Sequence, residues 1–256
     1  ILNGKPSGIL IDNAIWDNAR GFLRSIKDYL TLTELPDIYG AFKTKKKESD
    51  SWSRNAIRIC QRKLVQDQAS ISTTGTECSQ ASQHYDIIVM DDVVVRENIG
   101  THEQREKIKT HYGDVISLLQ PDGILVVVGT PWQEEDLYTQ LRDPEHERGK
   151  KFIGNTFVRK AFDGKTEESV VFPNKFNVAN LKSIEADQGP FLFSAQYMMD
   201  PYPVEDQSFK REWIQRYAEY PKVPMYIAMT LDPSLGKETS DFAAIVVTGI
   251  DVKGDI

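Results

Sequence analysis

Two short apolar runs constrain the fold of this chain more than any other feature. Residues 87–90 read IIVM and residues 124–128 read ILVVV, without the alternating polar residues of a half-exposed strand. Such runs are typical of parallel strands that are buried on both faces. The first run ends in Asp91 and Asp92, and the second ends in Gly129 and Thr130. Because open α/β sheets bind ligands at the carboxyl ends of their strands, we expect a functional site there.

The segments around the two runs follow a strand–helix–strand order. A strand at residues 9–11 precedes a helix at 15–30, a strand at 85–90 precedes a helix at 101–119, and a helix at 134–141 follows the second run. This order predicts an α/β fold with a parallel, right-handed sheet flanked by helices. Between these elements we expect local features in this order: a hairpin over residues 52–71, a loop at 73–76 and a turn at 121–123.

Closely spaced prolines near residue 201 divide the sequence. Before them we predict helices at 177–187 and 191–198, and beyond them strands at 225–231 and 242–250. The domain organisation that we expect is a first domain over residues 1–200, a linker over 201–220, and the start of a second domain over 221–256. The aromatic residues near the linker suit packing better than base stacking: Phe191, Phe193, Tyr197, Phe209 and Trp213.

Composition narrows the classes of function. The formal net charge of -7 over 256 residues gives no overall basic field, although a local basic groove can sit on an acidic protein. The basic run at residues 43–47 is either a solvated loop or a phosphate-contacting patch. Cys60 and Cys78 lack metal-ligand spacing, which favours a reduced intracellular protein. No apolar stretch approaches the roughly 20 residues of a membrane span. Because the chain lacks an initiator Met, we expect it to be a fragment.

A buried strand that ends in two adjacent carboxylates is the arrangement of a Walker B nucleotide-hydrolysing site. One acid, Asp91, would hold magnesium through its water shell, and the next, Asp92, would orient or deprotonate the attacking water. If the two strands are neighbours, Thr130 lies beside Asp91, where its hydroxyl can sense the γ-phosphate, and Gly129 permits a close backbone approach. The alternative is that these are ordinary turn residues.

At this point the chain resembles the large terminase subunits of tailed bacteriophages. The resemblance lies in motifs whose order and spacing cover nearly the whole chain: YDIIVMDD at residues 85–92, VGTPWQEEDLY at 128–138, FSAQY at 193–197, FKREW at 209–213, LDPS at 231–234 and SDFAA at 240–244.

The resemblance implies a P-loop-type ATPase sheet followed by the start of a ribonuclease-H-like nuclease domain. It implies the cofactors ATP and Mg²⁺, with Mg²⁺ or Mn²⁺ at the nuclease site. Its expected partners are double-stranded DNA, a portal protein, a small terminase subunit and further copies of the chain in a ring on the procapsid, in the host cytoplasm and without a membrane.

Residue by residue, Asp91 matches the metal-binding acid and Asp92 the catalytic carboxylate, which is usually Glu. Gly129 and Thr130 match the coupling motif, whose strand in the family lies between the phosphate-loop strand and the Walker B strand. Asp232 matches the first metal-binding acid of the nuclease. Asp241 matches an acid of the following turn.

The chain also departs from the family pattern. It has no G-x-x-x-x-G-K-[ST] phosphate loop, so we expect that loop upstream of Ile1 and the later nuclease acids beyond Ile256. We therefore predict that the fragment alone neither hydrolyses ATP well nor cleaves DNA, whereas the intact protein does both. The main alternative is a non-catalytic prophage remnant or assembly subunit that binds DNA, portal or small terminase. A helicase-like repair ATPase is a weaker alternative, against which the Asp232 segment argues.

Overall fold

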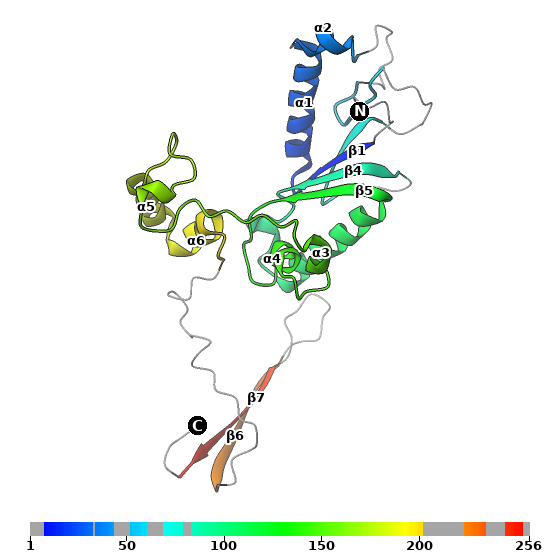
Figure 1. Cartoon of the computed structure of the whole chain (residues 1–256). Helices are drawn as coiled ribbons and strands as arrows, with labels where there is room; N and C mark the ends of the chain where they lie inside the picture. Colours follow the sequence, from blue (N-terminus) through cyan, green and yellow to red (C-terminus); the bar gives the residue numbers. More distant parts are fainter. Residues whose placement is uncertain are drawn as a thin grey trace. The chain divides into compact units, whose positions relative to one another are not determined.

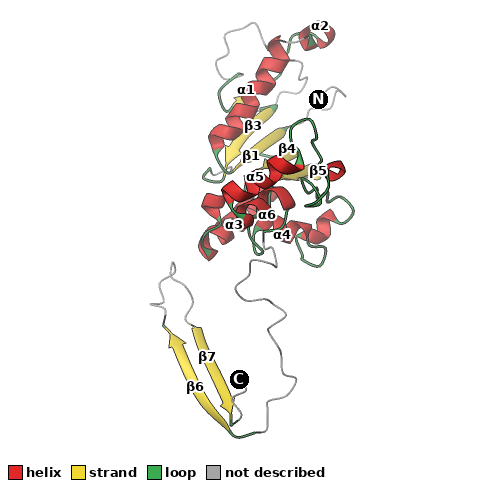
Figure 2. Cartoon of the chain, turned by 90° about the vertical axis from the view of Figure 1, so that its left-hand side faces the viewer, coloured by secondary structure: helices red, strands yellow, loops and turns green. Residues whose placement is uncertain are grey.

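The computed structural model describes residues 8–32, 34–43, 52–60, 69–78, 83–201, 223–233 and 244–252 (Figures 1 and 2). The chain divides into two compact units, Ile1–Asp206 and Gln207–Ile256. The predicted linker falls mostly outside the described residues, so the domain boundaries stay a prediction.

The first unit is built on a five-stranded, mostly parallel sheet in the order β2-β3-β1-β4-β5. Strand β1 pairs in parallel with β3 and β4, β4 pairs in parallel with β5, and β2 is antiparallel at one edge. The predicted α/β class with a mostly parallel sheet is therefore confirmed. The strand bounds are Ile9–Asn13 for β1, Ala56–Ile57 for β2, Ile71–Gly75 for β3, Tyr85–Asp91 for β4 and Leu119–Val128 for β5.

Helices lie on both sides of this sheet, with α1 on one side and α3 and α4 on the other (Figure 1). Successive strand residues point to opposite faces, so Ile11 joins the α1 side and Leu10 joins the α3 side. Buried Ile88 and Met90 of β4 also pack on the α3 side. The helix bounds are Trp16–Leu32 for α1, Leu35–Tyr39 for α2, His102–Ser117 for α3, Leu137–Arg142 for α4, Val178–Gln188 for α5 and Pro190–Met198 for α6.

The expectation that both apolar strands are buried on both faces is wrong for β5. Ile124, Val126 and Val128 are 58%, 39% and 51% exposed, whereas Leu125 and Val127 pack against the core on the α3 side. The physical reason is that α1 contacts β1 and β3, which lie two and three strands away from the edge strand β5. Among the described residues, the α1-side face of β5 therefore has little cover.

Two local predictions are also wrong. The loop expected at residues 73–76 is largely strand β3, because Thr73 is buried and its hydroxyl donates a hydrogen bond to the Asn55 carbonyl at 3.0 Å. When its polar groups have hydrogen-bond partners, a β-branched residue such as threonine is well suited to a buried strand. The turn expected at residues 121–123 lies within β5, as an irregularity between the pairs Tyr85–Leu119 and Ile87–Ile124.

Helices α5 and α6 share a small core of their own. Phe193 of α6 is 3% exposed and stacks on Tyr197 with ring centroids 4.9 Å apart, while Phe162 meets Phe193 edge-on. The packing interpretation is therefore confirmed for Phe193 and Tyr197. Phe209 and Trp213 lie outside the described residues.

The second unit contributes an antiparallel pair of strands, β6 over Met225–Asp232 and β7 over Ala244–Asp251 (Figure 2). Its apolar side chains are exposed on both faces of the hairpin, as at Tyr226 and Ile227. A two-stranded hairpin that packs against nothing else is marginally stable in water. Across both units, the described helices include none with the length and hydrophobicity of a membrane span.

Candidate functional site

The residues singled out at the ends of the two apolar runs come together in the structure. Strands β4 and β5 are parallel neighbours, and Asp91 pairs in register with Val128. Asp92, Gly129 and Thr130 follow directly, so all four candidate residues lie at the same end of the sheet. The condition on which the sequence-based site depended, that the two strands are neighbours, is met.

The peptide between Asp91 and Asp92 is held from both sides. The Asn13 side-chain amide of β1 donates a hydrogen bond to the Asp91 carbonyl at 2.7 Å. On the other side, the Asp92 amide donates to the Val128 carbonyl at 3.0 Å. The strands on both sides of β4 thus fix the point where its acids begin.

The next peptide, between Asp92 and Val93, is also held at both of its polar groups. Its carbonyl accepts a hydrogen bond from the Ala14 amide at 3.2 Å, and its amide donates to the Tyr138 hydroxyl at 2.8 Å. Asp92 has a φ of 46°, a left-handed conformation that is uncommon for a residue other than glycine. Four hydrogen bonds on its two flanking peptides therefore hold Asp92 in an unfavoured backbone state, as often occurs at functional sites.

The two carboxyl groups share a region where ionisation is disfavoured. Partial burial raises the pKa of Asp91, and the nearby Asn13 amide opposes this effect. Partial burial also raises the pKa of Asp92, and the negative charge of Asp91 raises it further. Asp92 is an exposed residue, so we expect its shift to be small. A cation at this place would relieve the repulsion between the two carboxylates.

The chain after β5 is shaped by a buried acid that caps helix α4. Asp136 is 1% exposed, and its carboxylate accepts hydrogen bonds from the amides of Trp132 at 2.6 Å, Gln133 at 3.0 Å and Thr139 at 2.8 Å. Such a cap satisfies amides at the start of the helix and fixes its direction. It thereby sets where Tyr138, the second residue of α4, enters the core.

Gly129 has a structural role that differs from a close approach to a ligand. A Cβ at this position would lie 2.2 Å from the Tyr138 ring, a distance that no real contact tolerates. Gly129 is therefore the residue that leaves room for Tyr138 beneath the end of β5. Thr130, the next residue, is half-buried.

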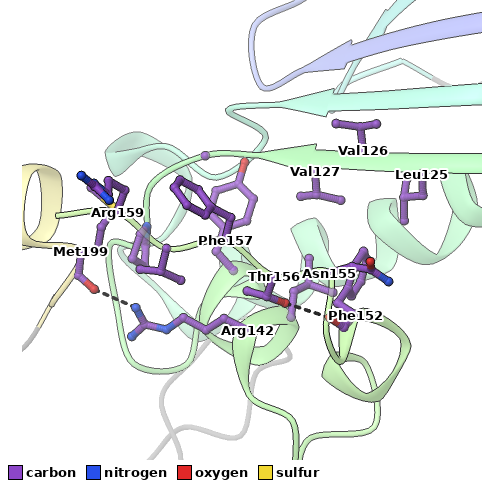
Figure 3. Close-up of a pocket in the computed structure, with 15 residues that line it drawn as sticks. Leu125, Val126, Val127, Arg142, Phe152, Asn155, Thr156, Phe157, Arg159 and Met199 are labelled. Carbon is purple, nitrogen blue, oxygen red and sulfur yellow. Dashed lines mark hydrogen bonds between the residues drawn. The ribbon is translucent and has the colours of Figure 1, made fainter. Parts of the chain in front are cut away.

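A cavity of about 480 Å³ lies beside β5 (Figure 3). One side is lined by Leu125, Val126 and Val127, and the other by residues 155–159. Arg142 lies at its border and donates a hydrogen bond to the Met199 carbonyl at 2.7 Å. Gly129 and Tyr138 line the cavity but Asp91 and Asp92 do not, so it adjoins the acid pair without containing it.

The structure describes only one of the two predicted nuclease residues. Asp232 ends β6 and is exposed, while Asp241 lies outside the described residues. Asp251 sits at the opposite end of the hairpin, about 24 Å away by seven strand steps of about 3.4 Å. Within the described ranges there is no cluster of three or more potential metal-ligating side chains from His, Cys, Asp and Glu.

Three contributors to the site were missed in the sequence. Asn13 donates to the Asp91 carbonyl, Tyr138 accepts from the Val93 amide next to Asp92, and Asp136 caps the helix that carries Tyr138. One signal for Tyr138 was present, because it closes the same matched segment that begins at Val128. Asn13 gave a weaker signal, as one of two polar residues that follow the short apolar run at residues 9–11.

Comparison with known proteins finds a similar chain among the terminases. A protein named terminase, large subunit, of Enterobacteria phage T3 is 24% identical over 181 residues, which cover 61% of this chain and 31% of the relative. The chain thus corresponds to about a third of that relative's length. No protein-family model matches the chain. These findings support a terminase-like relationship and a role connected with phages.

Proposed function

We propose that the ends of β4 and β5 form the hydrolysis and coupling part of an ATP-driven enzyme that packages phage DNA, of the large-terminase type. The observation that carries the proposal is the pairing of Asp91 with Val128, which places two carboxylates of one strand beside the Gly129-Thr130 turn of the next. Similarity to the phage T3 terminase large subunit supports the same assignment.

Asp91 and Asp92 fit a magnesium–nucleotide site by the chemistry of their donor groups. Magnesium in such sites takes one or two carboxylates and completes its shell with water and phosphate oxygens. Burial raises the pKa of both carboxyl groups, and the charge of Asp91 raises that of Asp92 further, so a bound cation would favour the ionised pair. Bound magnesium would neutralise charge on the phosphates of ATP. Asp91 would hold it, and Asp92, fixed by its two anchored peptides, would orient or deprotonate water.

The phosphate-binding part of the site would come from a further strand on the open side of β5. Residues 125–127 and residues 155–159 face each other across the 480 Å³ cavity, which leaves a slot beside the β5 edge. A strand placed there would lie beside the coupling strand, as the large-terminase resemblance implies. A helix following that strand would cover the exposed Ile124, Val126 and Val128.

Coupling to DNA movement would start at Thr130. Thr130 follows Val128, the partner of Asp91, by two residues, and from this strand end its hydroxyl would respond to the loss of the γ-phosphate. Strand β5 continues through Gly129 and the Asp136 cap into α4, so a shift at Thr130 reaches a helix within a few residues. The moving partner is double-stranded DNA, with the portal protein, the small terminase subunit and a ring of further copies as assembly partners.

A nuclease activity in the second unit is the other half of the proposal. Asp232 at the end of β6 would supply one carboxylate of a two-metal site, in which metals activate water and stabilise the leaving oxygen. Asp241 and later acids would supply the rest. Mg²⁺ or Mn²⁺ suits such oxygen ligands.

The decisive experiment is DNA-stimulated ATP hydrolysis by the intact protein with Asp91→Ala. We expect a loss of at least about 100-fold, because removing a magnesium ligand forfeits several kcal/mol of charge stabilisation. The matched control is Asp114→Ala, an exposed acid on α3, which should leave the rate unchanged. Unchanged hydrolysis in Asp91→Ala would refute the assignment. Absence of hydrolysis in the unmodified intact protein would favour a non-catalytic assembly subunit instead.

A further inference from the structure

Tyr138 hydrogen-bonds to the backbone at the ends of both β4 and β5, although it has no part in the proposed hydrolysis chemistry. Its ring is 7% exposed beneath Gly129, and its hydroxyl lies between the two candidate strand ends. The hydroxyl donates a hydrogen bond to the Val128 carbonyl at 3.1 Å and accepts one from the Val93 amide at 2.8 Å. The Val94 amide is a further, longer contact at 3.5 Å. A phenol hydroxyl has one donor and two acceptor positions, so its hydrogen-bonding capacity is fully used.

The two bonded groups belong to the two halves of the proposed site. Val93 follows Asp92, and Val128 precedes the Gly129-Thr130 turn. The Val128 carbonyl also accepts the Asp92 amide at 3.0 Å, so one oxygen receives hydrogen bonds from both the acid residue and Tyr138. Tyr138 therefore connects the backbone of the acid loop to the end of the coupling strand through a single side-chain atom.

The hydroxyl keeps its proton, which the contact to Val128 requires. Burial raises the pKa of Tyr138 well above its usual range, the Val94 and Val93 amides oppose the shift, and the charges of Asp92 and Asp91 add to it. Loss of the hydroxyl would leave the Val93 amide and one site on the Val128 carbonyl without this partner in a buried place. Unmade buried hydrogen bonds are costly, so the loop would have reason to rearrange.

We propose that Tyr138 is a positioning residue that holds Asp92 and the Thr130 turn in one fixed relation, so that loss of its hydroxyl lowers the rate of ATP hydrolysis without weakening nucleotide binding to the same degree. The effect on hydrolysis rests on the proposed function. The hydrogen bond from the Val93 amide to the Tyr138 hydroxyl, which we call the tether, does not depend on that function.

The chain offers a matched control for the substitution that removes the hydroxyl. Tyr112 of α3 is 4% exposed, and its buried hydroxyl has no hydrogen-bond partner among the described residues. Tyr112→Phe and Tyr138→Phe thus delete the same atom from two buried rings, but only the second deletion breaks contacts with the site. A general loss of packing would affect both variants alike.

The first measurement is hydrogen exchange of the Val93 amide in the whole chain, which needs no nucleotide. We expect Tyr138→Phe to accelerate it by about tenfold relative to Tyr112→Phe, because the amide loses its acceptor. Equal Val93 exchange rates in the two variants would overturn the tether.

The second measurement is steady-state ATP hydrolysis by the intact protein at a temperature where both variants are folded. We expect kcat to fall about tenfold in Tyr138→Phe with KM for ATP changed less than about threefold, and both constants to stay near those of the unmodified protein in Tyr112→Phe. Equal kcat values in the two variants would overturn the positioning role. Hydrolysis that is insensitive to Asp91→Ala would instead overturn the proposed function, and the exchange experiment would still decide the tether.

Discussion

The ends of β4 and β5 differ from the β6–β7 hairpin in how their acids are held. Both regions carry a carboxylate at a strand end that we propose as a metal ligand. The backbone around Asp92 is bonded to β1, β5 and α4, elements that lie far apart in the sequence. Among the described residues, Asp232 pairs across its own hairpin, opposite Ala244. A strand-end pattern thus locates an acid, but a site forms only where distant segments fix that acid in place.

The apolar residues of the first region are also more deeply buried than those of the hairpin. Ile88 of β4 is fully buried between β1, β5 and α3, whereas Ile227 of β6 is 73% exposed. Burial of apolar surface stabilises a strand in its position, so the packing of β4 holds its acids more firmly than the exposed strands of the hairpin hold Asp232. The proposed hydrolysis site is therefore the better formed of the two.

The comparison predicts that the two proposed activities can be removed separately in the intact protein. Asp91→Ala should lower ATP hydrolysis by at least about 100-fold and leave metal-dependent DNA cleavage intact. Asp232→Ala should lower cleavage by at least about 100-fold and leave hydrolysis intact. Both activities are measured on each purified variant, with far-UV circular dichroism as a check on folding. Loss of both activities in either variant would mean that the regions do not act as separate sites.

A smaller effect is expected on stability. Ile88→Ala should lower the free energy of unfolding by about 3 kcal/mol, because it leaves a cavity in a packed core. Ile227→Ala on the exposed hairpin should change it by less than about 0.5 kcal/mol. Urea unfolding followed by tryptophan fluorescence gives both values. Similar losses in the two variants would show that the hairpin is packed as firmly as β4.

The smallest predicted effect is a pH dependence at Asp92. Its pKa is raised in the folded state, so the ionised carboxylate costs stability at neutral pH, and this cost begins as pH rises through the ordinary Asp pKa of about 3.9. Asp92→Asn should therefore raise Tm by about 1 °C more at about pH 7 than at about pH 4. Asn also tolerates the left-handed backbone, which adds a gain that is independent of pH. A Tm difference equal at the two pH values would contradict the raised pKa.

Much of the fold was predictable from local patterns. Apolar runs at residues 87–90 and 124–128 gave the neighbouring strands β4 and β5, and helical spacing after residue 15 gave α1. Strand β3 was missed because its threonines are polar, and polar residues in a short segment favour a loop. In the structure, hydrogen bonds to Asn55 and Trp16 satisfy the polar groups of Thr73 and allow it to be buried. Hydrogen-bond partners this far away in the sequence leave no local trace.

Of the candidate site, only the residues at the strand ends could be predicted from the sequence. Asp91, Asp92, Gly129 and Thr130 follow strands and can be read from the sequence. Tyr138 could not be assigned a role, because its function depends on a hydroxyl that meets two backbone groups from separate strand ends. The exposed face of β5 was also unforeseen, since an apolar run does not reveal whether a helix lies above it.

The most direct test of the proposed hydrolysis site is a single-turnover comparison of Asp92→Asn with the unmodified intact protein. Asparagine keeps the size and the left-handed backbone of Asp92 but cannot accept a proton from water. Nucleotide affinity should stay within about threefold, while the rate of ATP hydrolysis in the presence of Mg²⁺ and DNA should fall by at least about 100-fold. A hydrolysis rate within about threefold of the unmodified protein would contradict the assignment of Asp92 as the residue that activates water.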